Sequence, residues 1–294
     1  MGTDSSDGRP VRPDTPPSLT RRRCRLAVLI AAHNRRNTTI SCLRALLQSQ
    51  CDHIMLSIYL VDDGSVDGTS EAVRNRFPQV TLVRGDGQLF WNGAMRRAWT
   101  TALASRPNFY LWLNDDTLLR PDALRDLLAL YESIAECDRR TVVVGRTTSS
   151  KGETTYGGYI HAEGLSRLRF RRLSASESEC DTFNGNCVLI PACAVEEIGL
   201  LSPRYRHAFG DIDYGLRTRR AGYRILEMKS PVAIQEQNEE YIRQTTKLTA
   251  TGWSFVLSHP KGVPVWEWLW FCRQHGGILW PINFVFRYVK MAFA

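Results

Sequence analysis

The sequence predicts an α/β fold, with a mostly parallel sheet covered by helices on both faces. Apolar runs of strand length alternate with segments whose apolar residues recur at helical spacing. Several of these runs are apolar throughout, which is typical of strands that are buried on both faces. Parallel neighbours need a crossover connection, and the helical segments supply it, so we expect helices above and below the sheet.

The predicted elements follow in a regular order from Leu26 onwards. Six apolar runs are predicted strands: 26–31, 55–61, 80–83, 109–113, 141–145 and 187–190. Six segments are predicted helices: 40–47, 69–77, 93–105, 121–134, 192–198 and 211–220. Asp67 suits a helix cap, Pro121 a first helical position and Gly222 a C-terminal cap. The weakly periodic region 147–181 is predicted to form either a hairpin or a mobile flap.

Composition sets the expected domain limits. The chain has 294 residues, of which 43% are hydrophobic and 23% charged, as in ordinary globular proteins. Residues 1–22 are rich in Ser, Asp, Gly and Pro and are expected to form a disordered arm. Residues 23–240 are expected to form the α/β domain, and residues 241–294 an aromatic-rich helical extension. No apolar stretch reaches the roughly 20 residues that span a bilayer.

Charge and cysteine pattern narrow the classes of function. The net charge is +8, and arginines cluster at 21–25 and 167–172. Such clusters suit anionic partners such as phosphates or a lipid surface, or they are simply solvated. No aromatic–basic binding module is recognisable, so no nucleic-acid partner is expected. The eight cysteines lack zinc spacing and are scattered as in a cytosolic protein, which argues against a disulfide framework.

Acidic residues stand where two of the predicted strands end. Asp62-Asp63 closes the second strand, and Asn114-Asp115-Asp116 closes the fourth. Ligands of α/β sheets bind beyond the carboxyl ends of the strands, so both groups are expected to face one crevice. A divalent cation clamped to a phosphate explains adjacent carboxylates there, because hard cations prefer oxygen ligands. A capped turn, which also favours Asp, is the alternative for each group.

A third acidic block opens the last predicted helix of the α/β domain. Asp211 and Asp213 stand at its start, close in sequence to His207 and Arg217. A carboxylate with such neighbours suits a general base that is oriented by its partners. The alternative is that the helix dipole alone stabilises these acids.

Three blocks in this order, VDDGSVDGT, LNDDT and GDIDYGLRTRRAGY, resemble family 2 glycosyltransferases of the GT-A type. The stretch VLIAAHNRRNTTISCLRALL is similar to the opening strand and helix of that family, and the resemblance covers about 26–235. Within that family, the chain resembles the rhamnosyltransferase-like type found in bacterial cell-surface polysaccharide synthesis. The resemblance implies a Rossmann-like GT-A domain. It also implies an inverting hexosyl transfer from a UDP- or dTDP-linked sugar to a hydroxyl of a glycan or lipid-linked glycan.

The resemblance implies a donor site at the ends of the first two strands. Asp62 and Asp63 would contact the nucleotide base and its ribose. The loop that contains Ala32, His33 and Asn34 would line the same base. These five residues would together hold the nucleoside half of the donor.

The metal and the base are implied in the same way. Asp116 would hold Mg²⁺ or Mn²⁺ on the donor diphosphate, with Asp115 and Asn114 close to it. Asp211 would deprotonate the acceptor hydroxyl, with Asp213 in support. One base and one displacement give inversion at the sugar carbon.

Two further segments complete the expected site. Asn92 and Gly93 would lie near the donor, and Asn184 and Gly185 would line the sugar pocket; turns are the alternative for both. Many relatives carry a His after the strand that follows the Asp211 helix. Here 230–236 contains none, so the third protein ligand of the metal is left open.

The C-terminal extension alternates aromatic rings with cations. Nine aromatic residues lie within 266–293, with Arg273, Arg287 and Lys290 among them. Rings beside Arg and Lys suit a membrane interface. The alternative is that they pack on the catalytic domain or on a second subunit. We expect a cytoplasmic enzyme that is peripheral at the inner face of the plasma membrane. Whether the enzyme forms a homo-oligomer is left open.

Two functions from different classes remain open. The first is the glycosyltransferase described above. The second is a non-catalytic relative with the GT-A fold that only binds a nucleotide sugar or a glycan. Asp211 beside a complete Asn114-Asp115-Asp116 block favours the enzyme.

Overall fold

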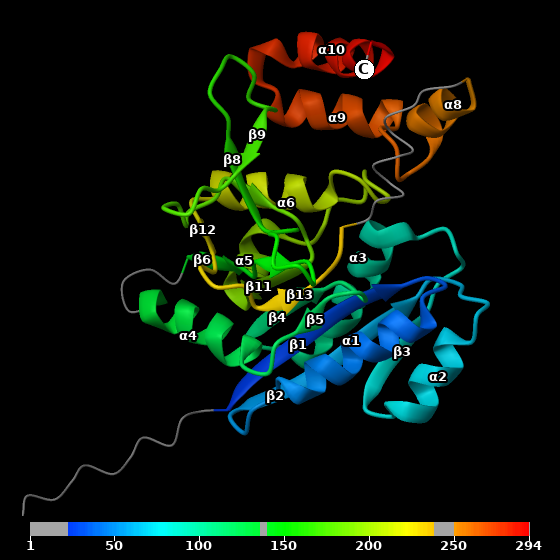
Figure 1. Ribbon diagram of the computed structural model, residues 1–294, viewed down its shortest axis with the longest axis vertical. Coiled ribbons are helices and arrows are strands. Elements are labelled where there is room, and N and C mark those ends of the chain that lie inside the picture. Colours follow the sequence, from blue (N-terminus) through cyan, green and yellow to red (C-terminus); the bar gives the residue numbers. More distant parts are fainter. Residues whose placement is uncertain (1–22, 136–139, 238–249, 294) are drawn as a thin grey trace, which may run out of the picture.

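A seven-stranded sheet forms the centre of the computed structural model, which describes residues 23–135, 140–237 and 250–293. The strand order is β12-β6-β11-β4-β1-β2-β3 (Figure 1). The strands are β1 (Cys24–Ala32), β2 (Ile54–Asp62), β3 (Val80–Arg84), β4 (Phe109–Leu113), β6 (Thr141–Val144), β11 (Cys187–Pro191) and β12 (Arg224–Glu227). β1 pairs in parallel with β2 and β4, β2 with β3, and β6 with β12. The predicted, mostly parallel sheet is confirmed.

One central strand, β11, runs against its neighbours. It is antiparallel to both β4 and β6. The chain forms short strands rather than a crossover helix between β6 and β11, so it enters β11 from the opposite end of the sheet. Cys187 at the start of β11 therefore pairs with Leu113 at the end of β4. Residues just before β11 are thus brought to the edge where the parallel strands end.

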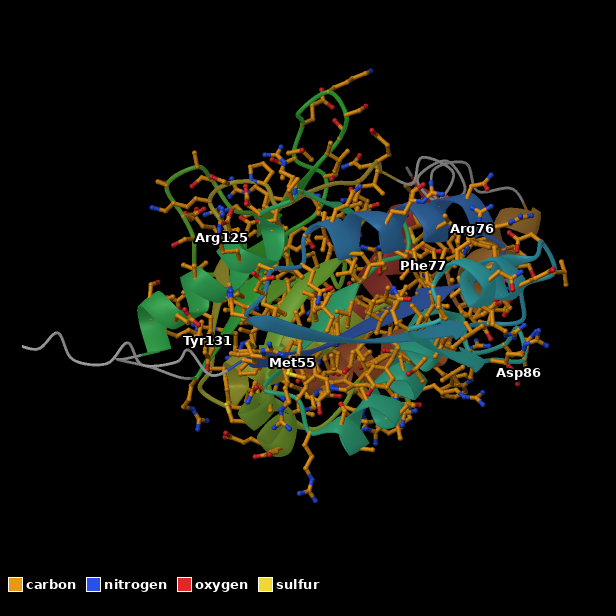
Figure 2. All side chains as sticks on the ribbon, turned by 90° about the horizontal axis from the view of Figure 1, so that it is seen from below. Met55, Arg76, Phe77, Asp86, Arg125 and Tyr131 are labelled. Atoms are coloured by element: carbon orange, nitrogen blue, oxygen red, sulfur yellow. The ribbon has the colours of Figure 1, made fainter. Side chains whose placement is uncertain are left out.

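Helices cover both faces of the sheet, as predicted. One face carries α1 (Arg36–Gln48), α2 (Thr69–Arg76) and α4 (Ala123–Ala135); the other carries α3 (Phe90–Ala102) with η1 (Leu103–Ser105), α5 (Ala192–Ile198) and α6 (Gly210–Arg220). Val28 belongs to the same buried cluster as Phe77 after α2 and Tyr131 of α4, which lie far apart along this layer in Figure 2. The next residue, Leu29, packs with Trp99 of α3 on the opposite face. Alternate side chains of one strand therefore fill two separate cores.

Two small sheets border the carboxyl-end edge. One has the order β5 (Leu118–Leu119), β13 (Ala233–Ile234), β7 (Thr147–Thr148); the other has the order β10 (Thr182–Phe183), β8 (Gly158–His161), β9 (Phe170–Arg172). β8 and β9 pair in antiparallel fashion. Of the two predictions for 147–181, the structure contains the hairpin.

The C-terminal helices pack on the outer side of α6. They are α8 (Ala250–Ser258), α9 (Val265–His275), η2 (Gly277–Leu279) and α10 (Trp280–Ala292). Trp268 and Phe271 of α9 are buried in a third cluster with Leu216 of α6, while Phe286 of α10 is exposed. Some rings therefore pack on the catalytic domain and others face solvent. No helix within the described residues is long and apolar enough to cross a membrane. The predicted arm, 1–22, lies outside the described residues.

Candidate active site

Three residues with left-handed backbone stand at the beginnings of the helices around the carboxyl-end edge. Asn34, just before α1, has φ 51°; Phe90, the first residue of α3, has φ 53°; and Phe209, just before α6, has φ 68°. This conformation is uncommon for residues other than glycine. Such strain concentrates where a site needs particular backbone geometry. The three helix starts bring together the predicted donor and acceptor residues.

Both acids at the end of β2 are buried and hydrogen-bonded to the chain. Asp63 accepts from the backbone N–H of Gly87 at 2.8 Å and of Phe90 at 2.9 Å, one on each oxygen. Asp62 accepts from the Ser65 N–H at 2.9 Å and from the Ser70 hydroxyl. The two acids thus fix the turn after β2 and the loop that leads into α3.

The loop after β1 is tied to that turn. His33 Nδ1 donates to the Asp63 carbonyl, which assigns the ring hydrogen to this nitrogen because a carbonyl can only accept. The Asn34 N–H donates to Ser65 Oγ at 2.8 Å, and Asn34 Oδ1 accepts from the Val66 N–H at 2.8 Å. His33 and Asn34 are exposed and Ala32, the last residue of β1, is buried. The predicted nucleoside-binding residues therefore form one preorganised rim.

The acids after β4 are bridged by a guanidinium. Arg35 donates from Nη1 to Asp115 Oδ1 at 3.0 Å and from Nη2 to Asp116 Oδ2 at 2.8 Å. Thr39 donates to the second oxygen of Asp115 at 3.3 Å. Gln235 Nε2 donates to the second oxygen of Asp116. All four carboxylate oxygens therefore face a donor from the protein.

Asp115 is the more deeply buried member of the pair. Its side chain is 5% exposed, against 23% for Asp116. Burial raises the pKa of Asp115 to about 7, although the charge of Arg35 acts in the opposite direction. Asp116 is therefore the acid that a ligand reaches more easily.

A chain of contacts links the Asp115–Asp116 edge to Asp211. The indole Nε1 of Trp91 donates to Asn114 Oδ1 at 2.8 Å. Gly185 packs against the same indole so closely that a Cβ there would lie 2.6 Å from its ring carbons. The Gly185 N–H donates to Asp211 Oδ2 at 2.9 Å. Next to it, Asn184 Oδ1 is buried without a hydrogen-bond partner among the described residues, and is thus available to a ligand.

Asp211 is the second residue of α6 and is half-buried. Its other oxygen accepts from the Ile212 N–H at 2.8 Å, as expected of an acid at a helix start. Burial raises the pKa of Asp211, with the Gly185 hydrogen bond acting in the opposite direction. A raised pKa makes a carboxylate a stronger proton acceptor.

Asp213 is placed away from Asp211. It is fully buried and binds Arg217 Nε at 2.8 Å and His275 Nε2 at 2.9 Å. His207 was also part of the predicted cluster. Burial lowers the pKa of His207 to about 4, so its imidazole is neutral near pH 7. The structure therefore brings Asp211 to the donor residues but turns Asp213 towards the C-terminal helices.

Asn92 lies inside the protein and not on the crevice wall. It is 0% exposed and donates to the carbonyls of Ser202 at 2.9 Å and Tyr205 at 2.6 Å. A Cβ at Gly210 would lie 2.0 Å from Asn92 Oδ1. Asn92 thus positions the start of α6, and Gly93 begins the next turn of α3 beside Leu89.

Sequence reasoning missed three residues of this arrangement: Arg35, Gln235 and His275. Arg35 stands within the opening block HNRRN, and Gln235 lies within 230–236, the segment where the resemblance implies a His, so position gave a signal for both. His275 has no such signal, because it lies 62 residues after the acid that it contacts.

The residues at this edge fit a divalent cation whose shell is completed by groups other than protein side chains. Asp115 and Asp116 supply hard oxygen ligands. No group of three or more His, Cys, Asp or Glu side chains that could hold a metal occurs among the described residues. Cations bound through one or two carboxylates complete their shell with phosphate oxygens and water. The site therefore suits a cation shared with a diphosphate.

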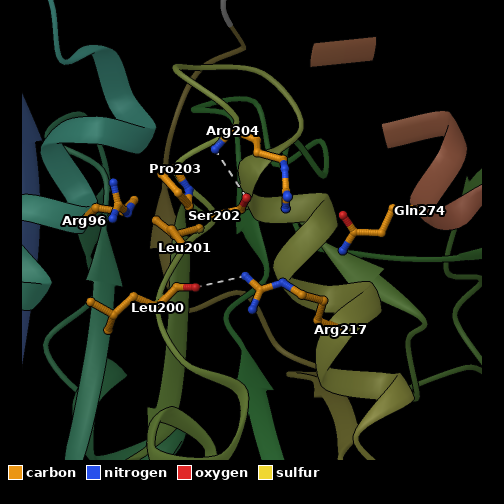
Figure 3. Close-up of a pocket in the computed structure, with 8 residues that line it drawn as sticks. All are labelled: Arg96, Leu200, Leu201, Ser202, Pro203, Arg204, Arg217 and Gln274. Atoms are coloured by element: carbon orange, nitrogen blue, oxygen red, sulfur yellow. Dashed lines mark hydrogen bonds between the residues drawn. The ribbon is translucent and has the colours of Figure 1, made fainter. Parts of the chain in front are cut away.

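A separate cavity lies away from these acids. It has a volume of about 440 Å³ and contains none of the predicted site residues. Arg96, Arg204 and Arg217 contribute to its wall, and no carboxylate lines it (Figure 3). Arg217 is already occupied, since Nη1 and Nη2 donate to the carbonyls of Ile198 and Leu200 at 3.0 Å each. This basic cavity is separate from the carboxylate edge.

An α/β sheet with acidic groups at its strand ends is the arrangement that the resemblance to GT-A glycosyltransferases implies. Residues 23–253 match the family described as glycosyltransferase like family 2, and the chain belongs to this family. The resemblance drawn from the three acidic blocks is confirmed.

Among curated proteins, the chain is similar to a rhamnosyltransferase. The chain is 26% identical over 195 residues to an N-acetylglucosaminyl-diphospho-decaprenol L-rhamnosyltransferase of Mycobacterium tuberculosis, known from two strains. The match covers 57% of this chain and spans 62% of the relative's length. It is thus a partial likeness to a bacterial rhamnosyltransferase.

Solved structures share the fold. The mannosyltransferase PcManGT from Pyrobaculum calidifontis, in complex with GDP-Man and Mn²⁺, superposes with a TM-score of 0.57 at 16% identity, covering 85% of this chain and 65% of that one. TarS 1–349 of S. aureus, in complex with UDP-GlcNAc, gives a TM-score of 0.53 at 13% identity, covering 71% and 57%. At these identities the likeness confirms the GT-A fold.

Proposed function

We propose that this glycosyltransferase moves a sugar from a UDP- or dTDP-linked donor to a hydroxyl of a glycan or lipid-linked glycan, with inversion. One observation carries the proposal: the continuous path from Asp115 through Asn114, Trp91 and Gly185 to Asp211. Asp211, a carboxylate of raised pKa, stands at one end of this path and suits a base, and the acid pair at the other end suits a cation on a diphosphate. Binding without catalysis needs no such base.

The donor half of the site is assigned from the rim and the bridged acids. His33, Asn34 and the Asp62–Asp63 turn hold the nucleoside. Asp116, with Asp115 behind it, holds Mg²⁺ or Mn²⁺ on the diphosphate. When bound, the cation neutralises the charge that develops on the leaving diphosphate.

The acceptor half depends on Asp211. The acceptor hydroxyl gives its proton to this carboxylate as its oxygen forms a bond to the sugar carbon. The bond from that carbon to the diphosphate oxygen breaks in the same step, and the nucleoside diphosphate leaves with the electron pair. Attack opposite the leaving group inverts the carbon. Asn184, with its unpartnered Oδ1, is available to hold a sugar hydroxyl.

The experiment is a panel of nucleotide sugars with Mn²⁺, measuring transfer and donor hydrolysis. Asp211→Asn and Asp116→Ala are compared with the exposed control Asp126→Asn. We expect turnover of one donor by the wild type and the control, and a loss in both site variants. Turnover unaffected by either substitution would contradict the proposal. Donor binding without turnover by the wild type would favour the binding-only relative.

The acceptor class is supported by the C-terminal surface. The outer side of α10 is an apolar stripe made of Ile282, Val285, Phe286 and Val289, which Phe293 continues just after the helix. Apart from the adjacent pair Val285 and Phe286, successive positions are three or four residues apart, which puts them on one face of the helix. Arg287 and Lys290 are exposed beside the stripe, and residues 268–294 contain no acid. We propose that this stripe lies on an anionic membrane surface at the cytoplasmic side, where a lipid-linked acceptor is reached.

Flotation with anionic liposomes tests the membrane proposal. The double variant Phe286→Ser/Val289→Ser keeps the partly buried face of α10, and the control is Met55→Ser, at an exposed apolar residue near the start of β2. We expect flotation of the wild type and of the control, and loss of flotation in the double variant. Equal flotation of all three would overturn it. A change in sedimentation without a change in flotation would instead mark the stripe as a homo-oligomer contact.

A further inference from the structure

The guanidinium of Arg35 occupies the position where a cation on the acid pair is needed. Its two terminal nitrogens lie 3.0 Å from Asp115 Oδ1 and 2.8 Å from Asp116 Oδ2. Charge-assisted contacts of this length are stronger than neutral hydrogen bonds. The Arg35 side chain is 44% exposed, and its guanidinium tip makes both contacts to the acid pair. Arg35 is thus the resident counter-ion of the pair.

Gln235 occupies one oxygen of Asp116, so an incoming cation has only the oxygen that Arg35 holds. Its Nε2 donates to Asp116 Oδ1, and its Oε1 accepts from Thr117 Oγ1 at 2.7 Å, which fixes the orientation of the amide. Asp116 Oδ2 is then the oxygen that an incoming ion meets at the crevice. This oxygen is the one that Arg35 holds. A divalent cation on Asp116 therefore has to displace Arg35.

The displaced side chain has a ready acceptor. Arg35 directly follows Asn34 of the nucleoside-binding rim, so its guanidinium stays at the border between nucleoside and metal. The diphosphate of a donor lies between those two. A planar guanidinium matches phosphate oxygens with two parallel hydrogen bonds. The same side chain therefore suits the acid pair in one state and the diphosphate in another.

We propose that Arg35 is an exchangeable counter-ion, which neutralises Asp115 and Asp116 in the free enzyme and moves to the donor diphosphate when a divalent cation takes its place. This rests on the proposed function, because it needs a diphosphate donor. Arg35 then opposes metal binding when no nucleotide is present, and supports nucleotide binding only when the metal is present. By linkage, the two effects belong to a single coupling between the metal and nucleotide sites.

The test measures affinity instead of turnover. Mn²⁺ binding is followed by electron paramagnetic resonance of the free ion, and UDP and dTDP binding by calorimetry, with Mn²⁺ or with a chelator. The variants are Arg35→Gln, Arg35→Lys, and the matched control Arg36→Gln, whose exposed side chain is the next along the chain. Circular dichroism confirms that each variant is folded.

Two opposite changes are expected in Arg35→Gln. In the absence of nucleotide, Arg35→Gln should bind Mn²⁺ about 5–10-fold more tightly than the wild type does. This factor is in the lower range of typical coupling between sites. Nucleotide affinity should fall by a similar factor with Mn²⁺ and stay unchanged with the chelator. Arg35→Lys should give an intermediate Mn²⁺ affinity, since one ammonium cannot bridge both acids. Arg36→Gln should change neither.

Other outcomes overturn the inference. Equal Mn²⁺ affinity in the wild type and Arg35→Gln would mean that Arg35 does not compete with the ion. A loss of nucleotide affinity that is equal with and without Mn²⁺ would make Arg35 a permanent phosphate ligand. If the wild type bound neither nucleotide and turned over no donor, the proposed function itself would fail. If the wild type turned over a donor but Arg35→Gln had unchanged Mn²⁺ affinity, the proposed function would stand. Only the proposal that Arg35 is an exchangeable counter-ion would then fail.

Discussion

His275 donates from Nε2 to Oδ1 of Asp213 across 2.9 Å, and both side chains are buried. The contact joins α9 of the C-terminal extension to α6, the helix that carries the proposed base near its start. Arg217 holds the other oxygen of Asp213 at 2.8 Å. The extension is thereby fixed to the element that positions Asp211.

Removing His275 should destabilise the fold. In His275→Ala the buried carboxylate keeps Arg217 but loses its second partner, and breaking a buried pair of this kind costs about 2–3 kcal/mol of the free energy of unfolding. Urea unfolding measures the loss. The control is His161→Ala, because His161 pairs with Asp181 near the surface and such pairs contribute about 0–1 kcal/mol. Equal losses in both variants would show that the Asp213 contact is not stabilising.

Asp115 should make the metal-free protein less stable as the pH rises towards neutral. Its pKa of about 7 in the folded state exceeds that of an exposed aspartate. The folded protein therefore binds a proton that the unfolded chain releases between these two values. The contribution is fully present below about pH 4 and is lost as the pH rises through about 7, with a slope of at most about 1.4 kcal/mol per pH unit.

Urea unfolding of Asp115→Asn in a chelating buffer checks this dependence. The variant carries a neutral amide of the same shape, so its stability should change less steeply between about pH 4 and 7. The exposed control Asp126→Asn should follow the wild type. Parallel curves for the wild type and Asp115→Asn would contradict the raised pKa.

Gly185 should tolerate no side chain. In Gly185→Ala the added Cβ would lie 2.6 Å from the Trp91 ring and 3.2 Å from Asp211 Cβ, so the loop has to move. We expect a loss of about 1–3 kcal/mol from overpacking and a fall in kcat of roughly 10–100-fold from the displaced base. Gly152→Ala is the control, because its Cβ meets nothing within 4 Å. It should lose stability through its φ of +85° and keep its activity.

The sequence predicted the positions that depend on local pattern. Asp62 and Asp116 end strands, and strand length and turn residues are readable within a short window. The direction of β11 was not predictable, because an apolar run looks the same whichever way it runs. Gln235 meets Asp116 across 119 positions, so their contact depends on how β13 is laid beside β5. Contacts between distant segments of this kind are set by tertiary structure alone.

If Asp211 is the base, the pH profile of kcat should have an acidic limb, in which kcat falls as the pH is lowered. A base acts only when it is deprotonated, so kcat should be constant at high pH and fall tenfold per unit below the pKa of this carboxyl. Because burial raises that pKa, the limb should begin above the value near 4 of an exposed aspartate. The pH profile of kcat at saturating donor measures it.

Asp211→Asn isolates the chemical role from the structural one. The amide oxygen can still accept from Gly185 N–H, so the donor KM should stay unchanged while kcat falls by about 10²–10⁴-fold, and the acidic limb should vanish from the residual rate. The exposed control Asp122→Asn should keep both rate and limb. A limb that survives in Asp211→Asn would assign the base to another group, because a group that has been removed cannot titrate. An unchanged kcat would remove Asp211 from the reaction altogether.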